Sequence, residues 1–480
     1  MPTRLGRGYV RLLLDSSSGE WKALSLFTMV DAIKGYEELG PEDGTYGGHT
    51  LSWDEVIDER RAQTERDPYV LIMGAGQSGL NVAARFKQMG IPTVVVEKEK
   101  RVGDVWRKRY PTLSLHSIRN HHTLLYQPYP NTWPQFTPGH KLADWLEQYA
   151  ISQELIVWTN SFVMPTPTYD YVNKKWTATI SRNGTEIVLH PGHIVSAIGS
   201  TGPPRVPELP GRELFQGTVL HSSEYKGGHA FTGKHTVVVG ACASAADICQ
   251  DVAFRGSASC TMVQRSSTCV LSLNTSMRTE GAMYPDNVPL DICDFKNSSL
   301  PLNLSRKFAK EEEAITLERE KELHTKLRNS GFKLNMGTDG SGYIFLIYER
   351  LGGSWRDRGL SDYFENGKVK VKQGVEVKRF TRNGVVFTDD TEMQADAVVF
   401  ATGYYDPRES LRTMFGADVI DQTEQAWGID QEGEIRGCFR PTGHPALWYG
   451  AGDFATSRFY SKQLGILIQA SQLGLISASA

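Results

Sequence analysis

The stretch LIMGAGQSGL, Leu71–Leu80, carries glycines at positions 74, 76 and 79 in the spacing GxGxxG. A continuous apolar run, YVLIM, precedes the loop, as in a parallel strand buried on both faces. The helical pattern NVAARFKQMG and the apolar strand TVVVE follow. This order of strand, loop, helix and strand predicts a βαβ unit whose loop holds a dinucleotide pyrophosphate at the helix N-terminus.

The three glycines and a downstream acidic residue have different roles in such a site. Gly74 permits the tight turn, Gly76 lets the backbone approach the pyrophosphate, and Gly79 allows close packing of the helix on the sheet. Glu97 ends the next strand, 23 residues after Gly74, where a carboxylate can accept a hydrogen bond from a ribose 2′-OH. A free 2′-OH is present in the adenosine of FAD and of NAD.

A second βαβ unit begins at VVVGACASAAD, Val237–Asp247. Gly240 and Ala245 suit the first and third loop positions, but Cys242 stands where such loops usually carry glycine. Arg265 lies 25 residues after Gly240, and a cation in place of the acid selects a 2′-phosphate, which indicates NADP. The alternative is a structural βαβ unit that binds no dinucleotide.

Composition excludes several other classes of protein. The 480 residues suffice for two or three domains, and 52 basic against 55 acidic side chains give a net charge of −3, which favours no nucleic-acid partner. The six cysteines form no CxxC pair and no cluster with zinc spacing, so we expect no metal site and a reducing, cytoplasmic compartment. No apolar run reaches the roughly 18 residues of a membrane span.

The N-terminal part differs from the two βαβ units in its predicted secondary structure. Over residues 9–38 the pattern predicts a hairpin, with strands YVRLLL and WKALSLF around the turn DSSSGE, followed by a helix over MVDAIKGYEE. Residues 39–67 are rich in glycine and acids and then helical in pattern and charged (WDEVIDERRAQTERD), and they are interpreted as a linker. Residues 303–330 are helical in pattern and highly charged, which is typical of a solvated helix.

The segment FQGTVLHSSEYK, Phe215–Lys226, lies between the two βαβ units. Its pattern F-x-G-x-x-x-H-x-x-x-Y-K resembles the fingerprint of the class B flavin-containing monooxygenases, with five fixed positions in twelve. The related Baeyer–Villiger enzymes carry tryptophan where Tyr225 stands. The stretch KRVGDVWRKRY, with Gly103 and Trp106, resembles the family's segment along the flavin. Further stretches resemble its two chain crossings (195–211 and 398–407) and its terminal strand, turn and helix (444–470).

The resemblance covers roughly residues 68–470 and implies a fold. We expect an α/β protein in which an FAD-binding domain (68–225 and 381–480) carries an inserted NADP-binding domain (226–380). Residues 1–67 would form a hairpin and helix appendage with a linker. The appendage resembles the tail of a cone-shaped NTF2-like domain found in microbial members of the family.

The resemblance also implies the chemistry. NADPH would reduce FAD, and O₂ would add to give a C4a-(hydro)peroxyflavin that oxygenates a small lipophilic substrate at nitrogen or sulfur, such as an intermediate of secondary metabolism. Baeyer–Villiger oxidation of a ketone and a flavin-binding protein with impaired NADPH use remain alternatives. A disulfide reductase is disfavoured by the absence of CxxC. The partners would be the substrate and O₂, and the oligomeric state stays open.

The resemblance transfers roles to individual residues. His116 would either touch the reacting flavin or be satisfied within its own loop, and His221 would act by positioning rather than as an acid or base. Pocket residues would come from 112–127, 270–300 and 352–359. The expected FAD contacts are Gly74, Gly76, Gly79, Glu97, Gly103 and Trp106, the expected NADP contacts are Gly240, Cys242, Ser244 and Arg265, and further cofactor contacts are Thr402, Gly403 and Asp453.

A side chain at position 242 should crowd the pyrophosphate of NADPH. Losing one well-made contact of this kind costs about 1–3 kcal/mol, so binding should be weakened rather than abolished. We therefore expect Cys242→Gly to speed the anaerobic reduction of bound flavin by NADPH, measured by stopped-flow absorbance. An unchanged rate, together with tight NADPH binding by the native protein, would contradict this interpretation.

Overall fold

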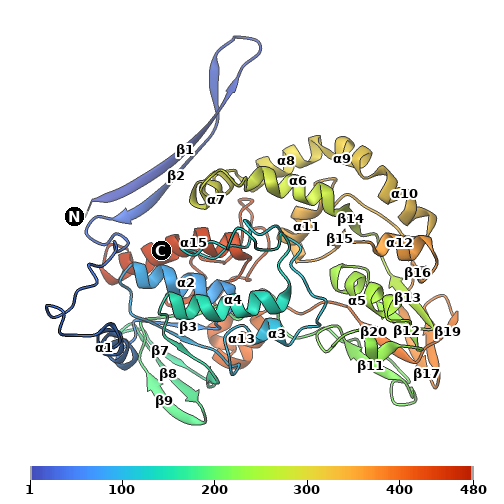
Figure 1. The fold of residues 1–480 in the computed structure, drawn as a ribbon, viewed down its shortest axis with the longest axis horizontal. Coiled ribbons are helices and arrows are strands. Elements are labelled where there is room, and N and C mark those ends of the chain that lie inside the picture. The colour runs from blue at the N-terminus through green and yellow to red at the C-terminus, as the bar shows by residue number, and fades with distance from the viewer. Residues whose placement is uncertain (1–2, 477–480) are drawn as a thin grey trace.

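The computed structural model describes residues 3–476. Two parallel β-sheets, each flanked by helices, form the body, and a β-hairpin projects from it (Figure 1). The predicted α/β class with two dinucleotide-binding domains is confirmed.

The first sheet contains five parallel strands in the order β21-β10-β3-β4-β5. Val70 and Ile72 of β3 point into a core shared with helices α2 and α15, while Leu71 points to the opposite face. The strand is therefore buried on both sides, as its continuous apolar sequence predicts. The bounds are β3 Val70–Met73, β4 Thr93–Val96, β5 Val157–Trp158, β10 His193–Ser196, β21 Leu447–Tyr449, α2 Gln77–Gln88 and α15 Phe454–Gln472.

The second sheet repeats this plan with the order β11-β20-β12-β13-β16, again all parallel. Val238 of β12 faces the core under helix α5, and Val237 faces the opposite core. The bounds are β11 Thr218–His221, β12 His235–Val239, β13 Ser259–Gln264, β16 Val369–Gln373, β20 Ala397–Phe400 and α5 Ala243–Phe254.

The expected domain boundaries at 225/226 and 380/381 need correction. Strand β11, which precedes residue 225, and strand β20, which follows residue 381, both lie in the second sheet. Strands β11 and β20 pair with each other in parallel, and β20 also pairs with β12. The chain therefore enters the second domain before Thr218 and leaves it after Phe400. Which strands become neighbours is decided by long-range pairing, which no local pattern encodes.

Small antiparallel sheets cover the outer face of each large sheet. Trp176 and Ile180 of one small sheet share a core with Leu71 and Val94 of the first large sheet. Phe380 and Phe387 of the other share a core with the second large sheet. The bounds are β6 Ser161–Val163, β7 Thr168–Asp170, β8 Lys175–Arg182, β9 Thr185–Leu189, β17 Val377–Thr381, β18 Gly384–Phe387 and β19 Glu392–Gln394.

A chain of helices forms an arch above the two domains (Figure 1). It begins in the second domain, and its helix α7 packs against α15 of the first domain. Arg458 of α15 and Asp294 of α7 form a buried ion pair there, with Nη2 to Oδ1 at 2.7 Å. The arch and the strand pair beneath it comprise α6 Leu273–Met283, α7 Leu290–Ser298, α8 Leu302–Glu311, α9 Glu313–Arg319, α10 Lys321–Asn329, α11 Tyr343–Arg350, α12 Leu360–Glu365, β14 Cys269–Ser272 and β15 Ser354–Asp357.

The remaining elements are short or peripheral. Residues 39–67, expected to be a linker, include one capped helix, in which the Ser52 and Glu55 side chains cap the first turn. The bounds are α1 Trp53–Arg66, α3 Asp104–Arg107, α4 Gly139–Ser152, η1 Gly228–Phe231, α13 Arg408–Phe415 and α14 Ala417–Ile420.

The N-terminal hairpin consists of β1 (Arg4–Leu14) and β2 (Trp21–Ile33). The helix predicted over MVDAIKGYEE is wrong, because Met29–Ile33 continue β2 and pair with the start of β1. Ile33 is buried in the first core, and this tertiary contact overrides the local helical pattern.

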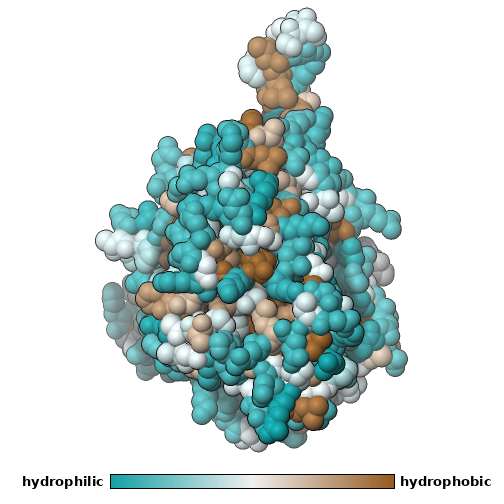
Figure 2. Space-filling view, turned by 90° about the vertical axis from the view of Figure 1, so that its right-hand side faces the viewer, coloured by the Kyte–Doolittle hydropathy of each residue, from teal (hydrophilic) through white to brown (hydrophobic). Residues whose placement is uncertain are grey.

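The outer part of the hairpin is exposed and apolar. Trp21 and Leu26 keep 67% and 72% of their surface accessible, and brown side chains mark the projection at the top of Figure 2. The base is fixed differently, because the rings of Tyr9 and Phe27 meet Phe295 of α7 edge-on, at centroid distances of 6.4 and 5.6 Å. Phe295 is itself buried. The hairpin is therefore held along its inner half, where Arg11 also donates to the carbonyl oxygens of Lys296 and Ser299.

Truncating the anchor should destabilise the protein, whereas truncating the exposed part should not. We expect Phe295→Ala to lower the free energy of unfolding by about 3 kcal/mol, since it removes a buried ring. The matched change Leu26→Ser should stay within about 0.5 kcal/mol. Denaturant unfolding followed by circular dichroism measures both, and equal effects would refute the proposed anchor.

Candidate cofactor cleft and domain junction

The first glycine loop has the geometry that its sequence predicts. Gly74 adopts φ +102°, and a Cβ there would lie 2.6 Å from the Ala197 carbonyl oxygen. A Cβ on Gly79 would lie 1.9 Å from the Gly74 oxygen. Gly76 is the N-cap of α2, and a Cβ there would meet nothing within 4 Å. The first and third glycines are therefore required by packing, and Gly76 leaves open space at the helix N-terminus.

The second loop repeats this geometry. Gly240 adopts φ +128°, and a Cβ there would lie 2.4 Å from the Ala401 oxygen. Cys242 is the N-cap of α5 with φ −105° and ψ −170°, extended like Gly76 at −76° and −176°. The cysteine is therefore unstrained, and its side chain occupies the position that is open in the first loop.

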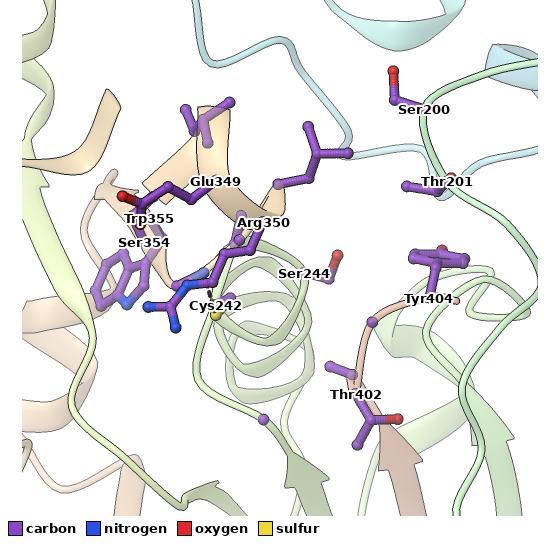
Figure 3. Close-up of a pocket in the computed structure, with 18 of the residues that line it drawn as sticks. Ser200, Thr201, Cys242, Ser244, Glu349, Arg350, Ser354, Trp355, Thr402 and Tyr404 are labelled. Atoms are coloured by element: carbon purple, nitrogen blue, oxygen red, sulfur yellow. Dashed lines mark hydrogen bonds between the residues drawn. The ribbon is translucent and has the colours of Figure 1, made fainter. Parts of the chain in front are cut away.

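The Cys242 sulfur has a defined partner across the cleft. It accepts a hydrogen bond from the Gly353 N–H at 3.2 Å, and Figure 3 shows it at the end of α5 with Arg350 and Ser354 nearby. Burial raises the pKa of the Cys242 thiol, so the group is neutral at pH 7. The side chain thus ties the second loop to the segment between α11 and β15.

A cleft of about 1500 Å³ lies between the two domains and under the arch. It brings together more than half of the residues expected to touch cofactors. The lining includes His116, Gly240, Cys242, Ser244, Arg265, Thr402, Gly403 and Asp453. The lining does not include Gly74, Gly76, Gly79, Glu97, Gly103, Trp106 or His221.

The expected FAD residues outside the cleft lie around the first loop. The Glu97 carboxylate accepts a hydrogen bond from the Ala75 N–H at 2.7 Å, so it is held against the loop. Gly103 is required by packing, because a Cβ would lie 2.4 Å from the Ala143 oxygen at φ +86°. The Trp106 indole N–H is buried and finds no partner among residues 3–476. A buried donor without a partner fits a bound group at this position.

The expected NADP residues lie on the other side of the cleft. The Arg265 side chain is 76% exposed and pairs with Glu376 at 2.9 Å, and such an exposed pair is weak enough to exchange for a phosphate. Ser244 lies in the first turn of α5. The Thr402 hydroxyl donates to the Arg205 carbonyl oxygen, and Gly403 adopts φ +79° in open space.

Two histidines of the segment 112–127 line the cleft, and each faces a carboxylate. His116 Nε2 lies 3.8 Å from Asp247 Oδ2, and the Tyr110 hydroxyl donates to the same oxygen at 2.6 Å. His121 Nε2 lies 3.3 Å from Asp453 Oδ2. Burial alone would lower the pKa of His121, but the Asp453 carboxylate outweighs it and holds this pKa above its usual value. Asp453 is one of the expected cofactor contacts, whereas no sequence pattern singled out Asp247.

The pocket segments 270–300 and 352–359 meet through a buried ion pair. Arg356 Nη2 donates to Glu280 Oε1 at 2.5 Å and to the Tyr343 hydroxyl at 3.0 Å. Arg356 Nη1 also donates to the His116 carbonyl oxygen. All three side chains line the cleft. They fix the arch above the loop that carries His116, a partnership that sequence analysis missed.

The fingerprint segment 215–226 forms the junction between the domains. A Cβ on Gly217 would lie 2.4 Å from the Asp396 oxygen and 2.5 Å from the Phe215 ring, so glycine is required there. The Tyr225 hydroxyl donates to Asp251 Oδ2 of α5 at 2.7 Å. Lys226 donates to the Lys108 carbonyl oxygen at 2.6 Å, which ties the junction to the first domain.

His221 belongs to the same junction. The Ser223 N–H donates to its Nδ1 at 3.2 Å, so Nε2 carries the proton and donates to the Gly403 oxygen at 3.1 Å. Burial lowers the pKa of His221, which leaves it neutral at pH 7. These contacts link β11 to the turn after β20. The positioning role expected for His221 fits them and stays a prediction.

Two features are absent from the part of the chain that the structure describes. No helix among residues 3–476 is long and apolar enough to cross a membrane. Within the same residues, no group of three or more histidine, cysteine, aspartate or glutamate side chains is arranged to hold a metal ion.

Comparisons with known proteins converge on one family. The profile of the flavin-binding monooxygenase-like family matches residues 68–408. The rice protein indole-3-pyruvate monooxygenase YUCCA1 (Oryza sativa subsp. japonica) is 30% identical over 354 residues, which cover 72% of this chain and 80% of the relative.

Solved structures share the fold at lower identity. The flavin-containing monooxygenase from Stenotrophomonas maltophilia has a TM-score of 0.55 at 18% identity, covering 85% of this chain and 98% of the other. OTEMO in complex with FAD and NADP has a TM-score of 0.60 at 15% identity, covering 85% of this chain and 87% of the other. At these identities the likeness establishes the architecture.

Removing the phenol of the junction should weaken the fold. Tyr225 is buried and its hydroxyl serves a buried carboxylate, so we expect Tyr225→Phe to lower the free energy of unfolding by about 1–3 kcal/mol. Tyr171→Phe is the matched control, because the Tyr171 ring is exposed and its hydroxyl contact with Gln422 is long, at 3.5 Å. Urea unfolding measures both, and indistinguishable midpoints would exclude the proposed role of the hydroxyl.

Proposed function

This chain belongs to the flavin-binding monooxygenase-like family, and on that premise we propose that it oxygenates a small lipophilic molecule with FAD, NADPH and O₂. The observation that carries the proposal is the pair of loops of matching geometry, one in each domain. The cleft between the domains reaches Gln77 after the first loop and Gly240 in the second. Two dinucleotides bound at these loops would both extend toward that cleft.

The residues present fit both cofactors. Glu97 is held where a carboxylate can accept from a ribose hydroxyl, the Trp106 N–H is free for a bound partner, and Arg265 can exchange Glu376 for a 2′-phosphate. When bound, the flavin supplies electron transfer and O₂ activation, and the protein supplies placement, exclusion of water and electrostatics. Asp453 and His121 place a paired charge at the N-terminus of α15, on the cleft wall.

The substrate would lie among aromatic and aliphatic side chains. Tyr348 of α11 and Trp427 meet across the cleft at a centroid distance of 6.3 Å, and the Trp427 indole N–H donates to the Ile347 carbonyl oxygen at 2.8 Å. Burial raises the pKa of Tyr343, so this phenol stays neutral at pH 7. Such a wall favours an uncharged, lipophilic nucleophile, oxygenated at nitrogen or sulfur, and we place the reaction in secondary metabolism.

Baeyer–Villiger oxidation is the second candidate, and one observation favours keeping it. Tyr225, where Baeyer–Villiger enzymes carry tryptophan, does not line the cleft; its hydroxyl binds Asp251 in the domain junction. Its identity therefore does not select the atom that is oxygenated by direct contact. The names of the similar plant enzymes refer to indole-3-pyruvate, a 2-oxo acid, so carbonyl substrates belong in the test.

The third candidate is a flavin-binding protein with impaired NADPH use, because Cys242 fills the space at the second loop. We further propose a cytoplasmic location, since all six cysteines are free thiols. The partners of the proposed reaction are the organic substrate and O₂.

The decisive experiment measures cofactor content and turnover together. We expect the purified protein to be yellow, to contain FAD, and to consume O₂ in an NADPH-dependent reaction that a panel of amines, sulfides, indoles, ketones and 2-oxo acids accelerates. Mass spectrometry of the products would identify the oxygenated atom. A yellow protein that NADPH fails to reduce would overturn the proposal in favour of the third candidate, and a protein without flavin would overturn both.

A further inference from the structure

Arg350 lies at the mouth of the second glycine loop. It is the last residue of α11 and lines the cleft. A Cβ on Gly353 would lie 2.6 Å from Arg350 Nη2, and the Gly353 N–H donates to Cys242 Sγ. The guanidinium therefore lies beside the backbone segment to which the cysteine is tied. Figure 3 shows Arg350 and Cys242 next to each other at the end of α5.

Within the described chain Arg350 has no acidic partner, unlike Arg306 and Arg356, two other arginines of the arch that line the cleft. Arg306 pairs with Glu349 at 2.6 Å, and Arg356 pairs with Glu280 at 2.5 Å. Among residues 3–476 no carboxylate forms an ion pair with Arg350. Arg350 is exposed, so its guanidinium is open to a ligand beside the positive N-terminal end of the α5 dipole. Two positive features in such proximity are stabilised by an anion placed between them.

Comparison of the two loops indicates which anion this is. At Gly76 nothing would lie within 4 Å of a Cβ, so a diphosphate can approach the amides at the start of α2. At the matching position of the second loop, Cys242 fills that space with a Cβ and a sulfur atom. The diphosphate of NADPH must then lie farther from the amides of α5, and those contacts weaken. A guanidinium can replace them, because it binds phosphate oxygens through two parallel hydrogen bonds.

We propose that Arg350 binds the diphosphate of NADPH and so replaces the close backbone approach that Cys242 blocks. This inference rests on the NADPH use proposed above. Arg265 has a separate role, since it directly follows β13, where a 2′-phosphate is recognised. Arg350 should therefore serve NADPH and NADH equally, whereas Arg265 should distinguish them.

The test uses the FAD-loaded protein and measures binding without turnover. Dissociation constants for NADP⁺ and NAD⁺ are obtained from the change in flavin absorbance on titration. We expect Arg350→Ala to raise both constants roughly tenfold or more, which is the loss of one charge-assisted contact. The ratio of the two constants should stay unchanged. Arg265→Ala should instead raise the constant for NADP⁺ alone.

Three controls separate binding from folding and from bulk charge. Arg278→Ala removes an exposed arginine of α6 that does not line the cleft, and it should leave both constants unchanged. FAD content and the unfolding midpoint of Arg350→Ala should match those of the native protein. In a Cys242→Gly background the amides become accessible again, so Arg350→Ala should then weaken binding by a smaller factor.

Each other outcome contradicts a specific statement. If the native protein binds NADP⁺ and Arg350→Ala binds it equally well, the inference fails while the proposed function stands. If Arg350→Ala weakens NADP⁺ alone, the arginine serves the 2′-phosphate and its assignment to the diphosphate is wrong. If the native protein binds neither nucleotide, the inference and the proposed use of NADPH fail together.

Discussion

The architecture depends on one close contact that occurs twice. In each large sheet the chain leaves a central strand through a tight turn. The turn passes directly beneath a carbonyl oxygen at the end of a neighbouring strand, that of Ala197 in one sheet and of Ala401 in the other. The gap is too small for any Cβ, so glycine is obligatory at positions 74 and 240. This turn aims the next helix back across the sheet and leaves its N-terminus facing outward. The turn therefore presents a helix N-terminus, the end that favours anions, in each domain.

The fingerprint segment shows how the two copies of that turn are joined. Its fixed positions have distinct physical tasks: Gly217 admits the Phe215 ring, His221 ties β11 to the turn after β20, and Lys226 reaches back to the first domain. None of these contacts requires an acid or a base. The five fixed positions of the pattern lie outside the cleft, so they serve the relation between the domains and do not select the substrate by direct contact.

Local sequence was sufficient for the two βαβ units and insufficient for the partners of their strands and side chains. Both βαβ units and their loops follow from runs of apolar residues and from glycine spacing, because strand burial and turn geometry are decided within about ten residues. The placement of β11 and β20 in the second sheet, the extension of β2 through Met29–Ile33, and the ion pairs of the cleft depend on chain segments far apart in sequence. No sequence pattern around Arg350 predicts a role, and its proposed role follows only from the cleft that it lines.

Cys242 is best understood through its charge as well as its size. A thiolate at the N-terminus of α5 would benefit from the helix dipole, and it would then repel a diphosphate from the same place. Burial opposes this by raising the pKa of the thiol, and the Gly353 N–H donates to a sulfur that remains neutral. The position therefore contributes bulk and a tether but no negative charge. A larger loop residue is compatible with a nucleotide site under these conditions, provided that a cation outside the loop replaces the contacts that the bulk removes.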